Sequence, residues 1–110
     1  IYTVERIKQL AEQARQRFRK LALRNVRASY SDGTEGLPDF APYDAIITTA
    51  AAEKIPQALL EQLSPDGGRL VIPLGGRDQQ TLTLVTRQGD SFEKTGLDPV
   101  VFVPLLTGQA

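Results

Sequence analysis

The stretch IYTVERIKQLAEQARQRFRKLALRNVRASYS, residues 1–31, decides the fold class. Residues Ile1 to Val4 are β-branched or aromatic, which is typical of a strand, and this run ends at Glu5. Between Arg6 and about Leu23, apolar residues recur at helical spacing with charged residues on the other faces, which predicts an amphipathic helix. Val26 to Ser31 then alternates weakly and predicts a second strand. The order strand, helix, strand favours an α/β fold.

Two strands of a buried type follow, with a short helix between them. Asp44 to Thr49 has a continuous apolar centre, Ala45 to Ile47, as expected of a parallel strand covered on both faces. Ile55 to Gln62 predicts a short helix with Pro56 in its first turn, where a missing backbone donor is tolerated. Arg69 to Leu74 predicts the second buried strand.

The C-terminal third is rich in strands. Thr81 to Thr86 and Ser91 to Thr95 predict an antiparallel hairpin. Val100 to Leu105 predicts a last strand, and Pro104 places that end at a sheet edge. The whole order predicts an open, doubly wound and mostly parallel α/β sheet with antiparallel strands at one edge.

The composition removes several classes of chemistry. The 110 residues include no cysteine and no histidine, which excludes thiolate nucleophiles, disulfide bonds, zinc sites built on those residues and catalytic triads that use histidine. No apolar run approaches the ~20 residues that a membrane-spanning helix needs. We therefore expect no metal site and no membrane partner.

The charge is distributed unevenly although the net charge is zero. Residues 1–27 hold eight of the thirteen Lys and Arg and only two acids, a net of +6, which the remaining residues balance. A nucleic-acid-binding module built on this basic helix is one alternative. Zero net charge and the lack of interleaved aromatic residues favour a solvated helix face instead, so we expect no nucleic-acid partner.

Three places at predicted strand ends carry candidate binding residues. In an open parallel sheet, ligands bind outside the carboxyl ends of the strands. Glu5 suits a ribose, because a carboxylate can accept hydrogen bonds from both ribose hydroxyls. Asp32 with Gly33 suits an adenine edge, because the acid can accept from the exocyclic amine and the glycine lets the backbone approach the base. Each signal alone is more often a solvated loop residue. Thr48 and Thr49 form the carboxyl end of the third strand and are candidates for a substrate site, or are there for their strand propensity.

Five segments in order along the chain resemble the protein-L-isoaspartate O-methyltransferase family. They are IYTVERIK (1–8), SDG (31–33), APYDAIITTAA (41–51), LSPDGGRLVIPLG (63–75) and FVPL (102–105). The match covers the whole chain. The two alanines before Ile-Pro and the final FVPL are its more specific parts.

The resemblance implies a Rossmann-like class I methyltransferase fold that transfers a methyl group from S-adenosylmethionine to the free carboxylate of L-isoaspartyl residues in damaged proteins. It implies that Glu5 contacts the cofactor ribose and that Asp32 and Gly33 lie at the adenine side. It also implies that Val103 lies near the isoaspartyl backbone, and Thr49 is our second candidate for substrate binding. We expect no catalytic side chain, because an ionised carboxylate is already a nucleophile and a sulfonium methyl is already activated. A class I methyltransferase with a different acceptor stays an alternative.

The family's first sheet strand and its glycine-rich loop have no counterpart in these residues. We therefore expect residues 1–110 to be the C-terminal part of a single cytoplasmic methyltransferase domain. We expect these residues alone to be inactive and to self-associate through unpaired strand edges.

Overall fold

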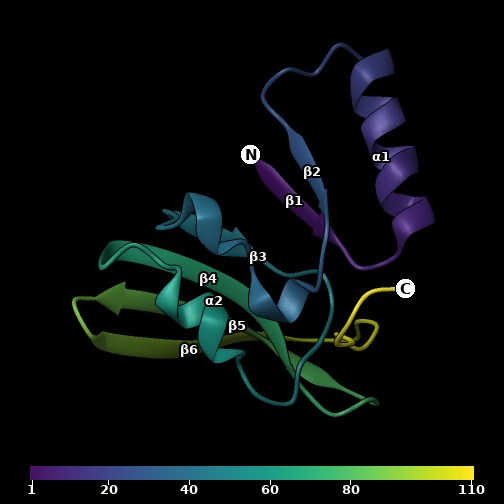
Figure 1. Cartoon of the computed structure of the whole chain (residues 1–110). Coiled ribbons are helices and arrows are strands. Elements are labelled where there is room, and N and C mark those ends of the chain that lie inside the picture. Colours follow the sequence, from purple (N-terminus) through teal and green to yellow (C-terminus); the bar gives the residue numbers. More distant parts are fainter. The chain divides into compact units, whose positions relative to one another are not determined.

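The computed structural model describes all residues, 1–110, and divides the chain into two compact units (Figure 1). Unit 1 comprises residues 1–36 together with 106–110, and unit 2 comprises residues 37–105. The last five residues of the chain thus belong with its first third.

Unit 1 is a strand, helix and strand. Strands β1 (Tyr2–Glu5) and β2 (Arg27–Tyr30) are parallel neighbours, and helix α1 (Lys8–Lys20) connects them. The prediction of this order is confirmed, but the helix ends at Lys20 rather than near Leu23. Neither helix has the length and apolar character that a membrane span requires.

Burial in unit 1 is slight. Ala11 is the one hydrophobic residue of this unit that is fully buried, while Leu10 on the same helix stays 45% exposed. A two-stranded sheet has little face to cover, and such a sheet is marginal by itself. The stability of unit 1 therefore owes little to a packed core.

Unit 2 contains one sheet in the order β3-β4-β5-β6. The edge strand β3 (Ala45–Ile47) is parallel to β4 (Asp66–Gly75). Strands β5 (Gln80–Gln88) and β6 (Ser91–Val100) continue the sheet in antiparallel pairing. The predicted hairpin and the antiparallel strands at one edge are confirmed.

A hydrophobic core lies between this sheet and helix α2 (Gln57–Glu61). Leu70 and Ile72 are two positions apart in β4 and so point to one face, and Val85 is the β5 partner of Leu70. The buried members of this cluster are Leu59, Leu63, Leu70, Ile72 and Val85. Pro56 immediately precedes α2, one position before the first turn in which it was expected.

Two sequence-based expectations about strands are wrong. Strand β3 is not covered on both faces, since Ile47 is 73% exposed at the edge of its sheet. The expected strand Val100–Leu105 does not form either. Val100 is already paired with Gln80, the first residue of β5, so β5 offers no pairing partner to the residues after Val100. Past that point Pro104 makes only an isolated bridge.

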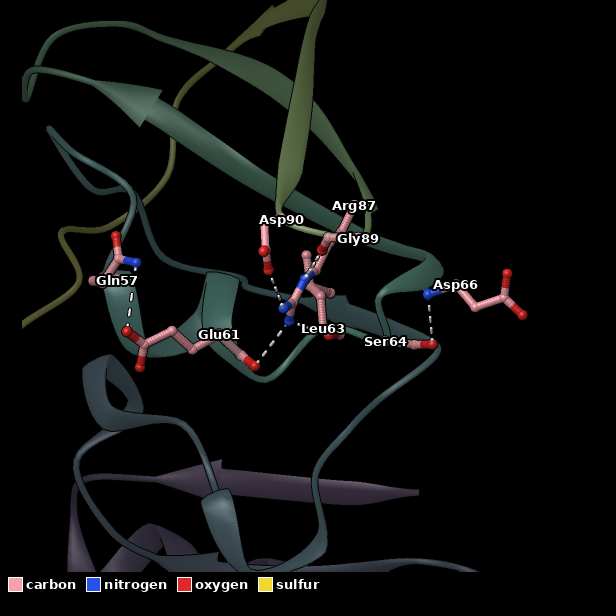
Figure 2. A network of polar contacts seen from close by, with 8 residues as sticks. All are labelled: Gln57, Glu61, Leu63, Ser64, Asp66, Arg87, Gly89 and Asp90. Carbon is pink, nitrogen blue, oxygen red and sulfur yellow. Dashed lines mark hydrogen bonds and ion pairs between the residues drawn. The ribbon is translucent and has the colours of Figure 1, made fainter.

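Arg87 of β5 joins the end of α2 to the β5–β6 turn (Figure 2). Its Nη1 donates to the carbonyls of Glu61 (3.1 Å) and Leu63 (2.8 Å), and its Nε donates to the carbonyl of Gly89 (2.7 Å). The ion pair with Asp90 is longer, at 3.8 Å, and the Asp90 side chain is fully exposed. The backbone bonds, rather than the ion pair, are the stabilising part of this network.

Candidate functional site

The carboxyl ends of β1 and β2 bring Glu5 and Asp32 to one edge of the unit 1 sheet. Glu5 ends β1 and is paired in register with Tyr30, the last residue of β2. The N–H of Ser31 donates to the Glu5 carbonyl at 3.0 Å, and Asp32 is the next residue. The two acids expected to bind a nucleoside are therefore neighbours in the structure.

Glu5 has one carboxylate oxygen engaged within the chain. Its Oε1 accepts a hydrogen bond from the backbone N–H of Ile7 at 3.1 Å, and the residue is half-buried. Its Oε2 has no partner in the chain and is an open acceptor at the strand end.

Asp32 is an ionised acceptor held by its neighbours. Its Oδ1 accepts from the hydroxyl of Thr34 at 2.6 Å and from the backbone N–H of Thr34 at 2.9 Å, and its Oδ2 accepts from the N–H of Gly108 at 2.9 Å. The Thr34 hydroxyl, followed by the Gly108 N–H, lowers the pKa of Asp32 below its ordinary value, and the charge of Arg6 adds to this. Each carboxylate oxygen accepts about two hydrogen bonds, so Oδ2 retains capacity for one more donor. Gly33, the third expected nucleoside residue, starts the 3₁₀ turn Gly33–Glu35, which Asp32 caps.

Arg6 is a further residue at this edge, and the sequence did not single it out. Its Nε is buried without a hydrogen-bond partner, and its charge acts on Asp32. A buried donor without a partner is costly, and because solvent does not reach this atom, a ligand does not reach it in this conformation either. The sequence signal that could have indicated Arg6 is its position directly after Glu5.

The C-terminal residues also return to this edge. The N–H of Ala110 donates to the Arg6 carbonyl (2.6 Å), the N–H of Lys8 donates to the Ala110 carbonyl (2.8 Å), and Gln109 Nε2 donates to the Tyr30 carbonyl (3.1 Å). No local pattern reveals such contacts, because they join residues at opposite ends of the chain.

Thr49 and Val103 belong to two segments that lie side by side in unit 2. Ala51 follows β3, and its N–H donates to the Val103 carbonyl while its carbonyl accepts from the Leu105 N–H, both at 2.7 Å. Thr49, two residues before Ala51, is exposed. Val103 is 68% exposed, and its own N–H makes no hydrogen bond within the chain. The structure thus pairs the segments of the two residues expected to contact the acceptor.

The basic helix borders an open hollow of about 350 Å³ in unit 1. Its lining residues are Arg15, Phe18, Arg19, Leu23, Val26 and Ala28. Since Val26 and Ala28 flank the start of β2, the hollow lies at the opposite end of that strand from Asp32. No group of three or more acidic side chains is arranged to hold a metal ion.

Solved structures define the class of this fold. A protein-L-isoaspartate O-methyltransferase structure matches with a TM-score of 0.86 and 26% identity, over 94% of this chain and 33% of that one. A second match, from Plasmodium falciparum and described as a β-aspartate methyltransferase in complex with S-adenosyl-L-homocysteine, has a TM-score of 0.82 and 24% identity, over 96% of this chain and 51% of that one. The chain therefore has part of the Rossmann-like class I methyltransferase fold, as the sequence predicted. The sheet of unit 2 is mixed rather than mostly parallel, because only β3 and β4 pair in parallel there.

Sequence comparison identifies the family within that class. The sequence model of the protein-L-isoaspartate(D-aspartate) O-methyltransferase family matches residues 1–110. A protein-L-isoaspartate O-methyltransferase of Azoarcus sp. is 53% identical over 98% of this chain and 49% of its own length. One of Dictyoglomus thermophilum is 55% identical over 96% of this chain and 47% of its own length. The chain belongs to the protein-L-isoaspartate(D-aspartate) O-methyltransferase family, as the sequence motifs implied, and it spans about half the length of these curated relatives.

Proposed function

We propose that the intact polypeptide containing this sequence methylates the free carboxylate of L-isoaspartyl residues in damaged proteins, with S-adenosylmethionine as methyl donor. The observation that carries the proposal is the family match over residues 1–110, together with relatives of that name that are about half identical to the chain. We also propose that residues 1–110 form part of a single methyltransferase domain and that the protein is cytoplasmic.

The carboxyl edge of β1 and β2 suits the nucleoside end of the methyl donor. Glu5 offers a free carboxylate oxygen for ribose hydroxyls, and Asp32 offers its Oδ2 to the adenine amine beside the Gly33 backbone. The charge of Arg6 acts on Asp32 at the same edge. When bound there, S-adenosylmethionine supplies an activated methyl group on its sulfonium.

The paired segments of unit 2 suit the peptide acceptor. The free N–H of Val103 can donate to a peptide carbonyl, and the exposed hydroxyl of Thr49 can hydrogen-bond a polar group of the substrate. The acceptor carboxylate is ionised at neutral pH and needs no general base. The task of these residues is therefore to orient the acceptor and exclude water.

Methyl transfer to matched peptides tests this function. The intact polypeptide is incubated with labelled S-adenosylmethionine and two peptides that differ only in carrying an L-isoaspartyl or an ordinary aspartyl residue. We expect label in the isoaspartyl peptide alone. No transfer to that peptide would contradict the proposal, and a small-molecule acceptor that outcompetes it would favour the alternative of a different acceptor.

A further inference from the structure

Backbone hydrogen bonds hold the segment that follows β3 on both sides. On one side, Ala52 lies against the end of β4, where its N–H donates to the Pro73 carbonyl (3.0 Å) and its carbonyl accepts from the Gly75 N–H (2.9 Å). On the other side, Ala51 is held by the C-terminal segment 102–105, as described above. Three segments of unit 2 are thus linked in a row, with β4 at one end and the Val103 segment at the other.

The Gln80 side chain joins the two ends of this row. Gln80 is the first residue of β5, is paired with Gly75 and is only 2% exposed. Its Nε2 donates to the carbonyls of Gly76 (2.6 Å) and Arg77 (3.4 Å), and its Oε1 accepts from the N–H of Phe102 (2.7 Å). Because the partners use both ends of the amide, they fix its orientation. The result is a closed ring of contacts through both expected substrate segments.

A buried amide at this position needs a reason, because burying a polar side chain costs free energy unless every group is paired. The pairing of β5 with β4 uses backbone groups and does not require it. What the amide orders is Phe102, the residue directly before Val103. We propose that Gln80 is a positioning residue of the acceptor site, holding Phe102 so that the free N–H of Val103 stays fixed beside the Ala51 segment. The role at Val103 rests on the proposed function.

Three variants of the intact polypeptide test this role. Gln80→Met keeps a side chain of similar size and removes all three hydrogen bonds. Gln80→Glu keeps an oxygen that accepts from the Phe102 N–H, but its other oxygen faces the two carbonyls and can donate to a carbonyl only while the carboxyl is protonated. Burial raises the pKa of such a carboxyl. Gln62→Met is the matched control, because Gln62 is also buried (7% exposed) and accepts from the Leu37 N–H, a bond outside the ring.

The kinetic result separates positioning from stability. In Gln80→Met we expect the KM for an isoaspartyl peptide to rise about tenfold, which corresponds to losing the one hydrogen bond from the Val103 N–H to the peptide. The affinity for S-adenosylhomocysteine should be unchanged. In Gln62→Met we expect a loss of stability with the KM unchanged. In Gln80→Glu we expect a KM that increases as the pH is raised, because the carboxyl then loses the proton with which it donates. Equal KM values in Gln80→Met and Gln62→Met would overturn the proposal.

Amide hydrogen exchange keeps this test independent of the proposed function. Gln80→Met should speed exchange at the N–H groups of Phe102, Ala51 and Leu105 relative to Gln62→Met. Unchanged exchange at these amides would overturn the positioning role, whether or not the protein is active. Faster exchange in a protein that methylates no peptide would instead support the ordering of the segment and contradict the proposed function.

Discussion

The two units are held together in different ways. Unit 2 has a packed core in which Leu63, Leu70 and Ile72 are completely buried, whereas unit 1 fully buries only Ala11 among its hydrophobic residues. At its carboxyl edge, unit 1 relies on hydrogen bonds such as those of Asp32. A packed core is rigid, while exposed polar contacts open locally and can be exchanged for contacts with a ligand. The difference is consistent with the proposal that unit 2 holds the peptide acceptor and that unit 1 contacts the nucleoside.

The largest effect should appear when the 110 residues are studied alone. Unit 1 has a two-stranded sheet, and β3 is an edge strand with Ile47 73% exposed. Such edges pair readily with another chain. We predict that the isolated chain self-associates and shows no measurable binding of S-adenosylmethionine. Light scattering at two concentrations and a cofactor titration check this, and a monomer with ordinary micromolar affinity would contradict it.

A matched pair of helix substitutions compares packing in the two units. Leu59→Ala in α2 removes a side chain that is 3% exposed, whereas Leu10→Ala in α1 removes one that is 45% exposed. We expect Leu59→Ala to lower the free energy of unfolding by about 2–5 kcal/mol and Leu10→Ala to lower it by less than about 1 kcal/mol. Urea denaturation of the intact polypeptide measures both. Equal losses would show that unit 1 is as well packed as unit 2.

The polar support of unit 2 can be tested at Arg87. Arg87→Ala leaves the carbonyls of Glu61 and Leu63 without their side-chain donor, and we expect it to cost about 2 kcal/mol of stability. The control Asp90→Ala removes only the exposed ion pair and should leave the stability almost unchanged. Should the two variants lose equal stability, the ion pair would be the important contact instead.

The smallest effect concerns the polar edge of unit 1. Thr34→Val removes the hydroxyl that most lowers the pKa of Asp32, so this pKa should rise toward 3.8, the ordinary value. Because the folded-state pKa is lowered, the ionised Asp32 carboxylate stabilises the fold fully at pH values above the ordinary pKa. This stabilisation is lost as the pH falls through the folded-state pKa. An NMR titration of the Asp32 carboxyl carbon measures the shift. An identical pKa in both proteins would show that the hydroxyl has no such role.

Local patterns were sufficient to predict much of the fold. The helical spacing from Arg6 onward and the hairpin around Gly89 are short-range signals, and both elements form. The extent of β6 was missed: its last residues include Gly96, Asp98 and Pro99, which have low strand propensity, but pairing with β5 overrides that preference.

The candidate site was only partly predictable, because some of its contacts join residues that are far apart in the sequence. Glu5 and Asp32 could be found because each stands where a strand ends. The contacts of Gly108 with Asp32 and of Gln80 with Phe102 join residues 76 and 22 positions apart, and no local pattern carries that information.

The central claim is that unit 1 binds the nucleoside end of the methyl donor, and calorimetric titration of S-adenosylhomocysteine tests it most directly. The proteins compared are the intact polypeptide and its Glu5→Ala, Asp32→Ala and Glu12→Ala variants, with exposed Glu12 on α1 as the matched control. We predict that Glu5→Ala and Asp32→Ala each weaken binding by about 1–3 kcal/mol, since hydrogen-bonding groups of the ligand lose their partners, and that Glu12→Ala leaves it unchanged. Unchanged affinity in both Glu5→Ala and Asp32→Ala would contradict the account.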